Sequence, residues 1–336
     1  MVYQGTVWGP TFWNTFFADS AQVFTSLQFS DVCYADDLNG FKAFAASVSD
    51  DAIHGELREL QAELHSWGAA NSVEFDAGKE SFHILSRSRP CGDSFKILGL
   101  AFDCKLLMHQ SVSDCVTACG WKMDSILRTR KFFTDREMVL FFKSHILSFI
   151  EYRTAGVYHA SRSITGRLDS VLDRFLRQLS ISPIDALVHF SLAPLSTRRD
   201  IAMLGVIHRA LLGKGPPQLH KFFFRDFNAP MRVRYRHSNH TRDFCNGGNC
   251  PDYLVRSAFG LVAIYNLLPQ YVVEACTVSA FQRHLQGIVT YLATTGFADW
   301  AACLNRSSLL TSVLTRINAF TVSSCSRLGS VRRLGR

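Results

Sequence analysis

Two adjacent carboxylates, Asp36 and Asp37, are the residues of this chain whose types and spacing most clearly suggest chemistry. An apolar run over residues 23–29 precedes them and Leu38-Asn39-Gly40 follows, so the pattern predicts a strand, a tight turn and a second strand. Carboxylate oxygens at such a turn suit Mg²⁺, which prefers oxygen ligands. Two such ions about 4 Å apart can align a hydroxyl and a triphosphate for in-line displacement. The alternative is a solvated turn that holds no metal.

Other segments lie around this pair in a suggestive order. Besides Tyr34-Ala35-Asp36-Asp37, they are Gln4-Gly5 with Gly9-Pro10 before an aromatic-rich stretch, Trp67-Gly68 through Lys79, and Phe95 to Leu100. In this order and spacing, the four segments resemble the palm of the reverse transcriptases of non-LTR (LINE-type) retrotransposons. A later segment over residues 265–269 favours this class over telomerase and group II intron enzymes, which share the palm. The resemblance covers roughly residues 3–290.

The resemblance implies an RNA-directed DNA polymerase that transfers nucleotides with two Mg²⁺ (or Mn²⁺) ions. Its partners would be an RNA template, a DNA primer and deoxynucleoside triphosphates. The implied site residues are Asp36 and Asp37 on the metal ions, Lys79 at the leaving pyrophosphate, Gln4, Gly5 and Tyr34 around the incoming nucleotide, and Phe95, Leu98 and Gly99 in the primer grip.

Each of these assignments has an ordinary structural alternative. Gln4 and Gly5 fit a plain loop before a helix, Tyr34 fits an aromatic that packs, and Lys79 fits a surface lysine. The segment at Phe95 fits a buried strand. Three further cations, which would neutralise nucleic-acid phosphates or else be solvated charges at a helix end, are Arg128, Arg130 and Lys131.

Charge divides the chain into two halves. Residues 1–110 hold 7 Lys and Arg against 14 Asp and Glu, a net charge of −7, and residues 111–336 hold 29 against 14, a net charge of +15. An acidic metal-binding half joined to a basic half suits a polymerase, because lysine and arginine neutralise phosphate. Many folded proteins are basic without binding nucleic acid, so the asymmetry is weak evidence alone.

Composition narrows the class of protein. With 47% hydrophobic and 19% charged residues in 336, the chain reads as globular. Ten cysteines without a paired framework and no signal peptide predict an intracellular protein of the nucleus or cytoplasm. The uncharged stretch 257–273 is shorter than the roughly 20 residues of a membrane span, so we interpret it as a buried helix that ends near Leu268 and expect no membrane partner.

The pattern predicts an α+β region followed by helices. The resemblance implies that these are a partial polymerase palm, an antiparallel sheet with helices, then an all-helical thumb and a helical carboxyl-terminal region. Ser49-Asp50-Asp51 predicts a helix start, and apolar residues then recur at helical spacing to Trp67, so this helix should pack on the sheet that bears Asp36. Strands are expected at 73–75 and 82–85, and a strand pair or one bent strand around Gly99 is expected at 95–102. The expected domains are a palm over 1–110, a thumb over 111–215, a basic linker over 216–252 and a helical region over 253–336.

One cluster has residues suited to zinc. His237, His240, Cys245 and Cys250 are spaced His-x₂-His-x₄-Cys-x₄-Cys, whereas structural zinc sites usually have a shorter gap between cysteines. The spacing leaves zinc binding open. Cys115 and Cys119, one helical turn apart, are expected in a core.

A complete enzyme of this family carries another palm aspartate before the Gln-Gly loop, and basic fingers that bind the triphosphate. Only three residues precede Gln4, so we expect this chain alone to lack both and to be inactive. Metal ions held chiefly by Asp36 would be under-coordinated. The alternative function is a non-catalytic nucleic-acid-binding remnant. A phosphohydrolase with an Asp-Asp turn would not account for the segments at Gln4, Lys79 and Gly99.

Overall fold

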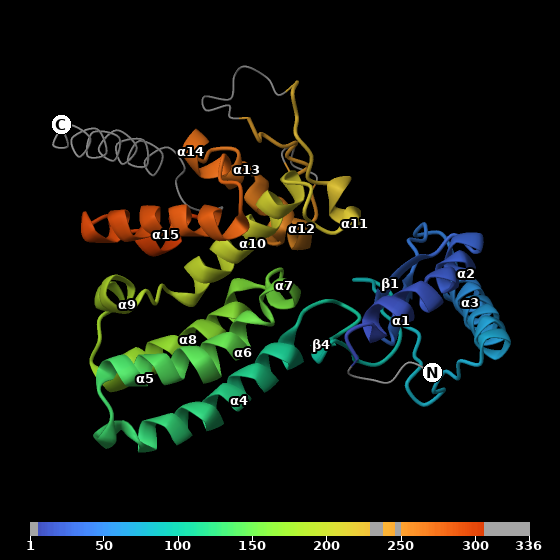
Figure 1. Ribbon diagram of the computed structural model, residues 1–336, viewed down its shortest axis with the longest axis horizontal. Helices are drawn as coiled ribbons and strands as arrows, with labels where there is room; N and C mark the ends of the chain where they lie inside the picture. Colours follow the sequence, from blue (N-terminus) through green and yellow to red (C-terminus); the bar gives the residue numbers. More distant parts are fainter. Residues whose placement is uncertain (1–5, 229–237, 246–249, 306–336) are drawn as a thin grey trace. The chain divides into compact units, whose positions relative to one another are not determined.

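The computed structural model describes residues 6–228, 238–245 and 250–305. The chain divides into two compact units, residues 1–93 and 94–336, so the division falls before the expected 110/111 boundary. Figure 1 shows the helices and strands of each. The described residues are mostly helical, with two small antiparallel sheets of two strands each, which is the coarse α+β fold expected from the sequence.

The amino-terminal unit consists of three helices and a hairpin within its described residues. Its elements are α1 (Gly9–Phe17), a 3₁₀ turn (Ala18–Ser20), α2 (Ala21–Ser26), β1 (Ser30–Tyr34), β2 (Asp37–Phe41) and α3 (Asp50–Asn71). The predicted start of α3 is confirmed, because the Ser49 side chain accepts a hydrogen bond from the Ala52 N–H and Asp50 and Asp51 lie in the first turn.

The helix α3 packs on the hairpin through a small apolar core. Phe24, Phe29 and Leu60 are its buried members, with Leu38 and Leu57 among the side chains packed against them. A Cβ at Gly40 would lie 2.6 Å from a Phe24 ring carbon and 3.0 Å from Leu60. The absent side chain at position 40 therefore lets β2 approach both helices, as expected for a sheet covered by α3.

Three strand predictions were wrong in this unit. Residues 23–26 of the apolar run lie in the helix α2, because this places Phe24 in the core, and the first strand begins only at Ser30. Residues 73–75 form no strand. The segment 82–85 keeps only an isolated bridge between Ile84 and Cys91.

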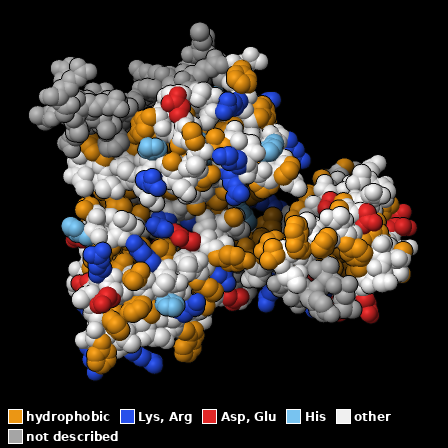
Figure 2. All heavy atoms as spheres, viewed as in Figure 1, with side chains coloured by type: hydrophobic (Ala, Val, Ile, Leu, Met, Phe, Trp, Pro, Cys, Tyr) orange, Lys and Arg blue, Asp and Glu red, His pale blue; other side chains and the backbone are white. Residues whose placement is uncertain are grey.

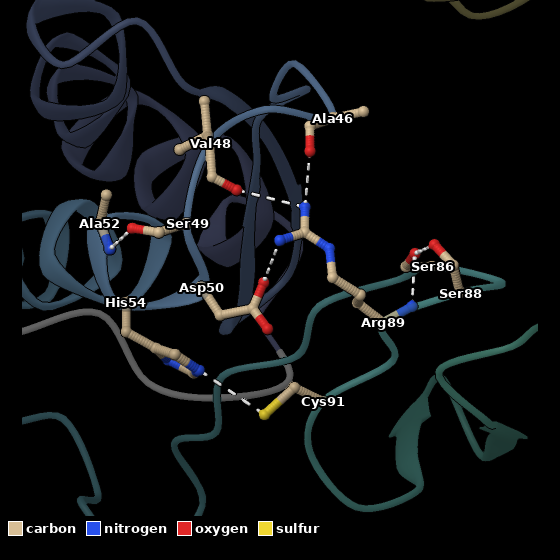
Figure 3. Close-up of polar contacts among 10 residues, drawn as sticks. All are labelled: Ala46, Val48, Ser49, Asp50, Ala52, His54, Ser86, Ser88, Arg89 and Cys91. Atoms are coloured by element: carbon tan, nitrogen blue, oxygen red, sulfur yellow. Dashed lines mark hydrogen bonds and ion pairs between the residues drawn. The ribbon is translucent and has the colours of Figure 1, made fainter.

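The loop that this bridge closes, between Ile84 and Cys91, is anchored to the start of α3 (Figure 3). The Arg89 guanidinium donates to the Ala46 and Val48 carbonyls at 2.9 and 3.2 Å and pairs with Asp50 Oδ1 at 3.3 Å. Cys91 Sγ lies 3.6 Å from His54 Nε2. The alternating pattern of residues 82–85 predicted a strand in a sheet. The structure shows instead that side-chain contacts fix this segment to the start of α3.

The carboxyl-terminal unit starts with a second hairpin, β3 (Phe95–Ile97) and β4 (Leu100–Phe102), which confirms the strand pair expected around Gly99. A π-helical turn (Lys143–Leu147) and 3₁₀ turns (Arg130–Phe132, Ala258–Leu261, Trp300–Ala302) interrupt the helical part. The helices are α4 (His109–Arg128), α5 (Asp135–Phe142), α6 (Ser148–Glu151), α7 (Thr154–Val157), α8 (Arg162–Leu179), α9 (Pro183–Phe190), α10 (Leu195–Leu211), α11 (Pro217–His220), α12 (Asp252–Arg256), α13 (Val262–Tyr265), α14 (Gln270–Val273) and α15 (Val278–Thr294).

Two apolar cores stabilise this unit. The first joins α4, α5 and α8, where the Phe142 and Phe175 rings stack at 4.4 Å and the expected core cysteines Cys115 and Cys119 are buried. The second joins α10 to α13 and α15 (Figure 1). There the His208 ring stacks on Phe281 at 4.1 Å.

The described part of the expected linker is fixed to the second core. Asn266 pairs with the Thr241 backbone, because its Oδ1 accepts from the Thr241 N–H at 3.0 Å and its Nδ2 donates to the Thr241 carbonyl at 2.7 Å. Asn239 Nδ2 donates to the Val273 carbonyl at 2.7 Å. Across the described ranges, no helix is long and apolar enough to cross a membrane.

Candidate functional site

The Asp-Asp pair lies at the tip of the β1–β2 hairpin. Tyr34 pairs with Asp37 in the antiparallel register, which leaves Ala35 and Asp36 as the two-residue turn. Ala35 has a φ of 55°, the positive value that a two-residue hairpin turn requires. Asp36 and Asp37 are both exposed, so the hairpin carries two exposed carboxylates at its turn, where the sequence predicted them.

The helix α1 holds this tip. Trp13 Nε1 donates a 2.8 Å hydrogen bond to the Ala35 carbonyl, and the Trp13 ring stacks on Phe17 at 5.1 Å. Burial, followed by the charges of Asp31, Asp36 and Asp37, raises the pKa of the Cys33 thiol on β1. Negative charge therefore gathers at this end of the hairpin, where a cation would be attracted.

The tip has the donors for one hydrated cation. Mg²⁺ is commonly held by one or two carboxylates and keeps several waters, which suits Asp36 and Asp37. Within the described ranges, however, no three His, Cys, Asp or Glu side chains are grouped so as to hold a metal ion. The pair therefore fits a single weakly held ion and is too small a donor set for two.

Of the remaining palm candidates, Tyr34 lies at the tip, where it pairs with Asp37 in the hairpin register, whereas Lys79 lies on a separate turn. Tyr34 precedes the turn and is 63% exposed. Lys79 Nζ pairs with Asp76 Oδ2 at 3.3 Å on an exposed turn. Gln4 and Gly5 lie outside the described residues.

The primer-grip candidates form the β3–β4 turn. Leu98 and Gly99 have φ values of 49° and 76°, so both turn residues are left-handed, and Phe95 stacks on Phe102 at 5.7 Å. The Tyr152 hydroxyl donates to the Leu98 carbonyl at 2.8 Å. This hairpin therefore belongs to the helical unit, with its turn fixed by a residue that directly follows α6.

The basic candidates lie at the end of α4 and in the 3₁₀ turn that follows it. Arg128, Arg130 and Lys131 are all exposed, Arg130 donates to the Gln178 carbonyl, and Lys131 Nζ lies 4.9 Å from the Phe132 ring centroid. Their arrangement can contact phosphate, and it equally suits solvated charges.

The zinc candidates are brought together only in part. Cys245 and Cys250 have sulfur atoms 3.0 Å apart, and His240 is buried. His237 lies outside the described residues. Since the described His, Cys, Asp and Glu residues include no group that could hold a metal ion, zinc binding stays an open prediction.

Sequence reasoning missed a second group of ionisable residues, in the carboxyl-terminal unit. Arg199 on α10 forms a fork with Asp169 on α8, with Nη1–Oδ1 and Nη2–Oδ2 distances of 2.8 and 2.9 Å. Next to it, the Tyr158 hydroxyl donates to Asp200 Oδ1 at 2.6 Å, and burial raises the pKa of Asp200 to about 7. One sequence signal was available, because Asp200 precedes the buried Leu204 by four residues and so shares its helical face.

Comparisons with known proteins were negative: no family model, no curated protein and no solved structure matches this chain.

Proposed function

We propose that this chain is a fragment of an RNA-directed DNA polymerase, the reverse transcriptase of a non-LTR retrotransposon, with Asp36 and Asp37 as its metal ligands. The observation that carries the proposal is the tip itself. Two exposed carboxylates stand at a two-residue turn whose Ala35 carbonyl is held by Trp13, from the aromatic helix that follows the Gln-Gly segment. Two of the resembling segments are thus in direct contact.

The surface around the tip supports a larger palm. Within the described ranges, β1 and β2 pair only with each other, so each has an open edge to which a further strand can add. Apolar side chains are also exposed on this unit and are visible on the face in Figure 2. They include Val7, Trp8, Phe12, Phe16, Val32 and Phe41. Exposed apolar groups favour the packing of another segment or a partner against this unit.

In this proposal the β3–β4 hairpin would be the primer grip and the helices from α4 to α10 the thumb. Template, primer and nucleotide would be the partners, with Lys79 acting at the pyrophosphate. Two carboxylates are too few for a two-ion site, so we expect the chain alone not to extend a primer.

Metal binding tests the proposal at the tip. In a Mn²⁺ titration followed by paramagnetic resonance, we expect weak binding that Asp36→Asn removes. Asp31→Asn, on β1 of the same hairpin, is the matched control and should retain binding. Equal Mn²⁺ affinity in all three proteins would refute the assignment of the tip as a metal site.

Activity is tested separately by primer extension on an RNA template with Mg²⁺. We expect no product from the chain alone. Extension that Asp36→Asn abolishes would overturn the expected inactivity while strengthening the polymerase assignment.

A second candidate function is a non-catalytic nucleic-acid-binding remnant. The net charge of +15 over residues 111–336 favours it, and Lys and Arg side chains are spread over the helical unit in Figure 2. Filter binding over a salt series should then give a steep slope. Replacing Arg128, Arg130 and Lys131 together by glutamine should reduce that slope by about 3 if all three contact phosphate.

A further inference from the structure

A cavity of ≈ 580 Å³ lies between α8, α10 and α12 of the carboxyl-terminal unit. Its charged lining comes from all three helices: Arg162 and Asp169 from α8, Arg199 and Asp200 from α10, and Arg256 from α12. None of these residues is among the candidate polymerase site residues, so this cavity is a separate site, although α8 and α10 belong to the proposed thumb.

Two helix amino termini face the cavity. Arg162 is the first residue of α8, and Ser196 is the second residue of α10. Neither helix has a side-chain N-cap hydrogen bond or an acidic residue in its first turn. The first N–H groups of a helix carry partial positive charge and favour anions. Together with three arginines against two aspartates, they make the lining favourable to an anion.

The three arginines differ in their partners. Arg199 forms an ion pair with Asp169, to which its Nη2 donates a hydrogen bond, and Arg162 donates to Asn305 Oδ1 at 3.0 Å. Arg256 donates through Nε to the His159 carbonyl at 3.0 Å, and its two terminal nitrogens have no hydrogen-bond partner among the described residues. Arg256 therefore offers the planar pair of donors that phosphate oxygens accept.

Asp200 supplies the second and independent observation. Its side chain is 5% exposed, and Oδ2 is buried without a hydrogen-bond partner within the described part of the chain, while Oδ1 accepts from Tyr158. An unsatisfied buried carboxyl oxygen is costly, so a cavity ligand that bonds to Oδ2 gains that contact.

The charges around Asp200 determine how it bonds. Burial raises its pKa to about 7, against the lowering effects of the Tyr158 hydrogen bond and of Arg199 and Arg162, and Asp169 raises it further. Cys303 also faces it, and burial raises the pKa of that thiol to about 12, so Cys303 stays neutral. Near pH 7, Asp200 can therefore either donate or accept one proton through Oδ2.

We propose that this cavity binds a phosphate oxyanion, inorganic phosphate or a phosphate monoester, which accepts hydrogen bonds from Arg256 and shares one proton with Asp200 Oδ2. Either Asp200 or the phosphate can supply the shared proton. A protonated Asp200 donates to a phosphate oxygen, and an ionised Asp200 accepts from the P–O–H of a phosphate that still carries a proton.

Proton sharing separates phosphate from sulfate. Well above pH 7, inorganic phosphate keeps one proton, whereas sulfate has none and a phosphate monoester, whose second pKa is about 6, has lost its own. Sulfate and the monoester must then take up a proton on Asp200, which weakens their binding about tenfold for each pH unit above the pKa of Asp200. Inorganic phosphate should not lose affinity in this way, because it still carries the proton that it shares with Asp200.

The test is calorimetric titration of the full chain with sodium phosphate, sodium sulfate and adenosine monophosphate, near pH 6.5 and near pH 8.5. We expect saturable phosphate binding at both pH values, and loss of at least tenfold in sulfate and monoester affinity at the higher pH. Tighter binding of the monoester than of phosphate near pH 6.5 would identify the ester as the natural ligand. No saturable phosphate binding, or the same pH dependence for phosphate and sulfate, would overturn the proposal.

Two variants and a control locate the site. Arg256→Gln should weaken phosphate binding at least tenfold, because it removes charge-assisted hydrogen bonds. Asp200→Asn places a permanent donor at the cavity, so it should bind phosphate and sulfate alike near pH 8.5. Arg167→Gln, an exposed α8 arginine outside the cavity that bonds to Ser113, should change nothing. Circular dichroism checks that each variant is folded, and unchanged phosphate affinity in folded Arg256→Gln would exclude this site.

Discussion

The hairpin tip and the α8–α10 cavity place the same chemical group in opposite surroundings. Asp36 and Asp37 are exposed to water on a turn of two residues. Asp200 is 5% exposed on a long helix, beside Arg199 and the Tyr158 hydroxyl. Water stabilises the charges of the first pair, whereas protein groups must stabilise that of Asp200 or it takes up a proton.

This difference in burial predicts that one carboxylate pair affects ligand binding and that Asp200 affects the stability of the fold. An exposed carboxylate adds little to folding, so its effect should be on what it binds. A buried carboxylate enters the free energy of unfolding directly, because its charge depends on the native surroundings. The same Asp→Asn substitution should therefore give opposite signatures at the two places, and four predictions test this contrast.

The largest expected effect is on the pH dependence of stability at Asp200. Its folded pKa of about 7 lies above the ordinary value of 3.8, so the protonated acid is favoured by folding. The associated stability is present below about pH 4 and is lost as the pH rises towards 7. A difference of about 3 pKa units corresponds to about 4 kcal/mol. Asp200→Asn, which mimics the neutral acid, should unfold at a higher urea concentration than the native chain near pH 8.

The same urea series near pH 3 is the internal control for this prediction. That pH lies below the ordinary pKa of 3.8, so Asp200 is mostly neutral in both folded and unfolded chains, and the variant and the native protein should be nearly equal. If the variant were less stable than the native chain at both pH values, the ionised Asp200 carboxylate would be stabilising the folded state. Its negative charge would then be balanced by the positive charge of Arg199.

Breaking the neighbouring ion pair should cost slightly less. Arg199→Gln removes the fork to Asp169 and leaves Asp200 without its nearest positive charge. Loss of one partner of a buried pair costs about 3–5 kcal/mol, and the lower end applies because the Asp169 side chain is 31% exposed. Urea unfolding near pH 7 measures the loss. An unchanged midpoint would mean that water already solvates this pair.

The two sites also differ in how far the sequence could predict them. The hairpin tip depends on neighbours in the chain, so Tyr34 to Asp37 was enough to place it. The start of α3 was equally local, since Ser49 caps its own first turn. By contrast, Asp200 follows two arginines in sequence and looks solvated. Its hydrogen-bond partner Tyr158 lies 42 residues away, and the neighbouring Arg199 pairs with Asp169, which is 30 residues from Arg199.

The wrong strand predictions have the same origin. An apolar run such as residues 23–29 suits either a strand or a helix, and packing decides between them. The helix α2 forms because Phe24 then packs against Leu60 and against Gly40, which has no side chain in the way. The segment 73–75 has no strand partner in the part of the chain that the structure describes, so its pattern alone could not form a sheet.

A smaller effect is expected where α1 holds the tip. Trp13→Phe keeps an aromatic ring against Phe17 but removes the Nε1 donor to the Ala35 carbonyl. One hydrogen bond contributes about 1 kcal/mol, and less where water replaces it. Fluorescence of Trp67, which contacts Phe17, should report this small loss on urea unfolding. A change of several kcal/mol would instead make Trp13 a core residue of the unit and not a support of the turn.

The smallest change in stability is expected at the tip itself, and there the contrast with Asp200 is sharpest. Asp36→Asn alters an exposed turn residue, so its free energy of unfolding should stay within about 0.5 kcal/mol of the native value at every pH. Its Mn²⁺ binding should nevertheless vanish, because only two carboxylates supply the site and an amide is a poorer ligand for a hard cation. Urea unfolding and Mn²⁺ titration of the same preparation measure both. If the native chain instead lost stability relative to Asp36→Asn as the pH rises, as expected at Asp200, the tip would be covered in solution. The two carboxylates would then be buried and not exposed.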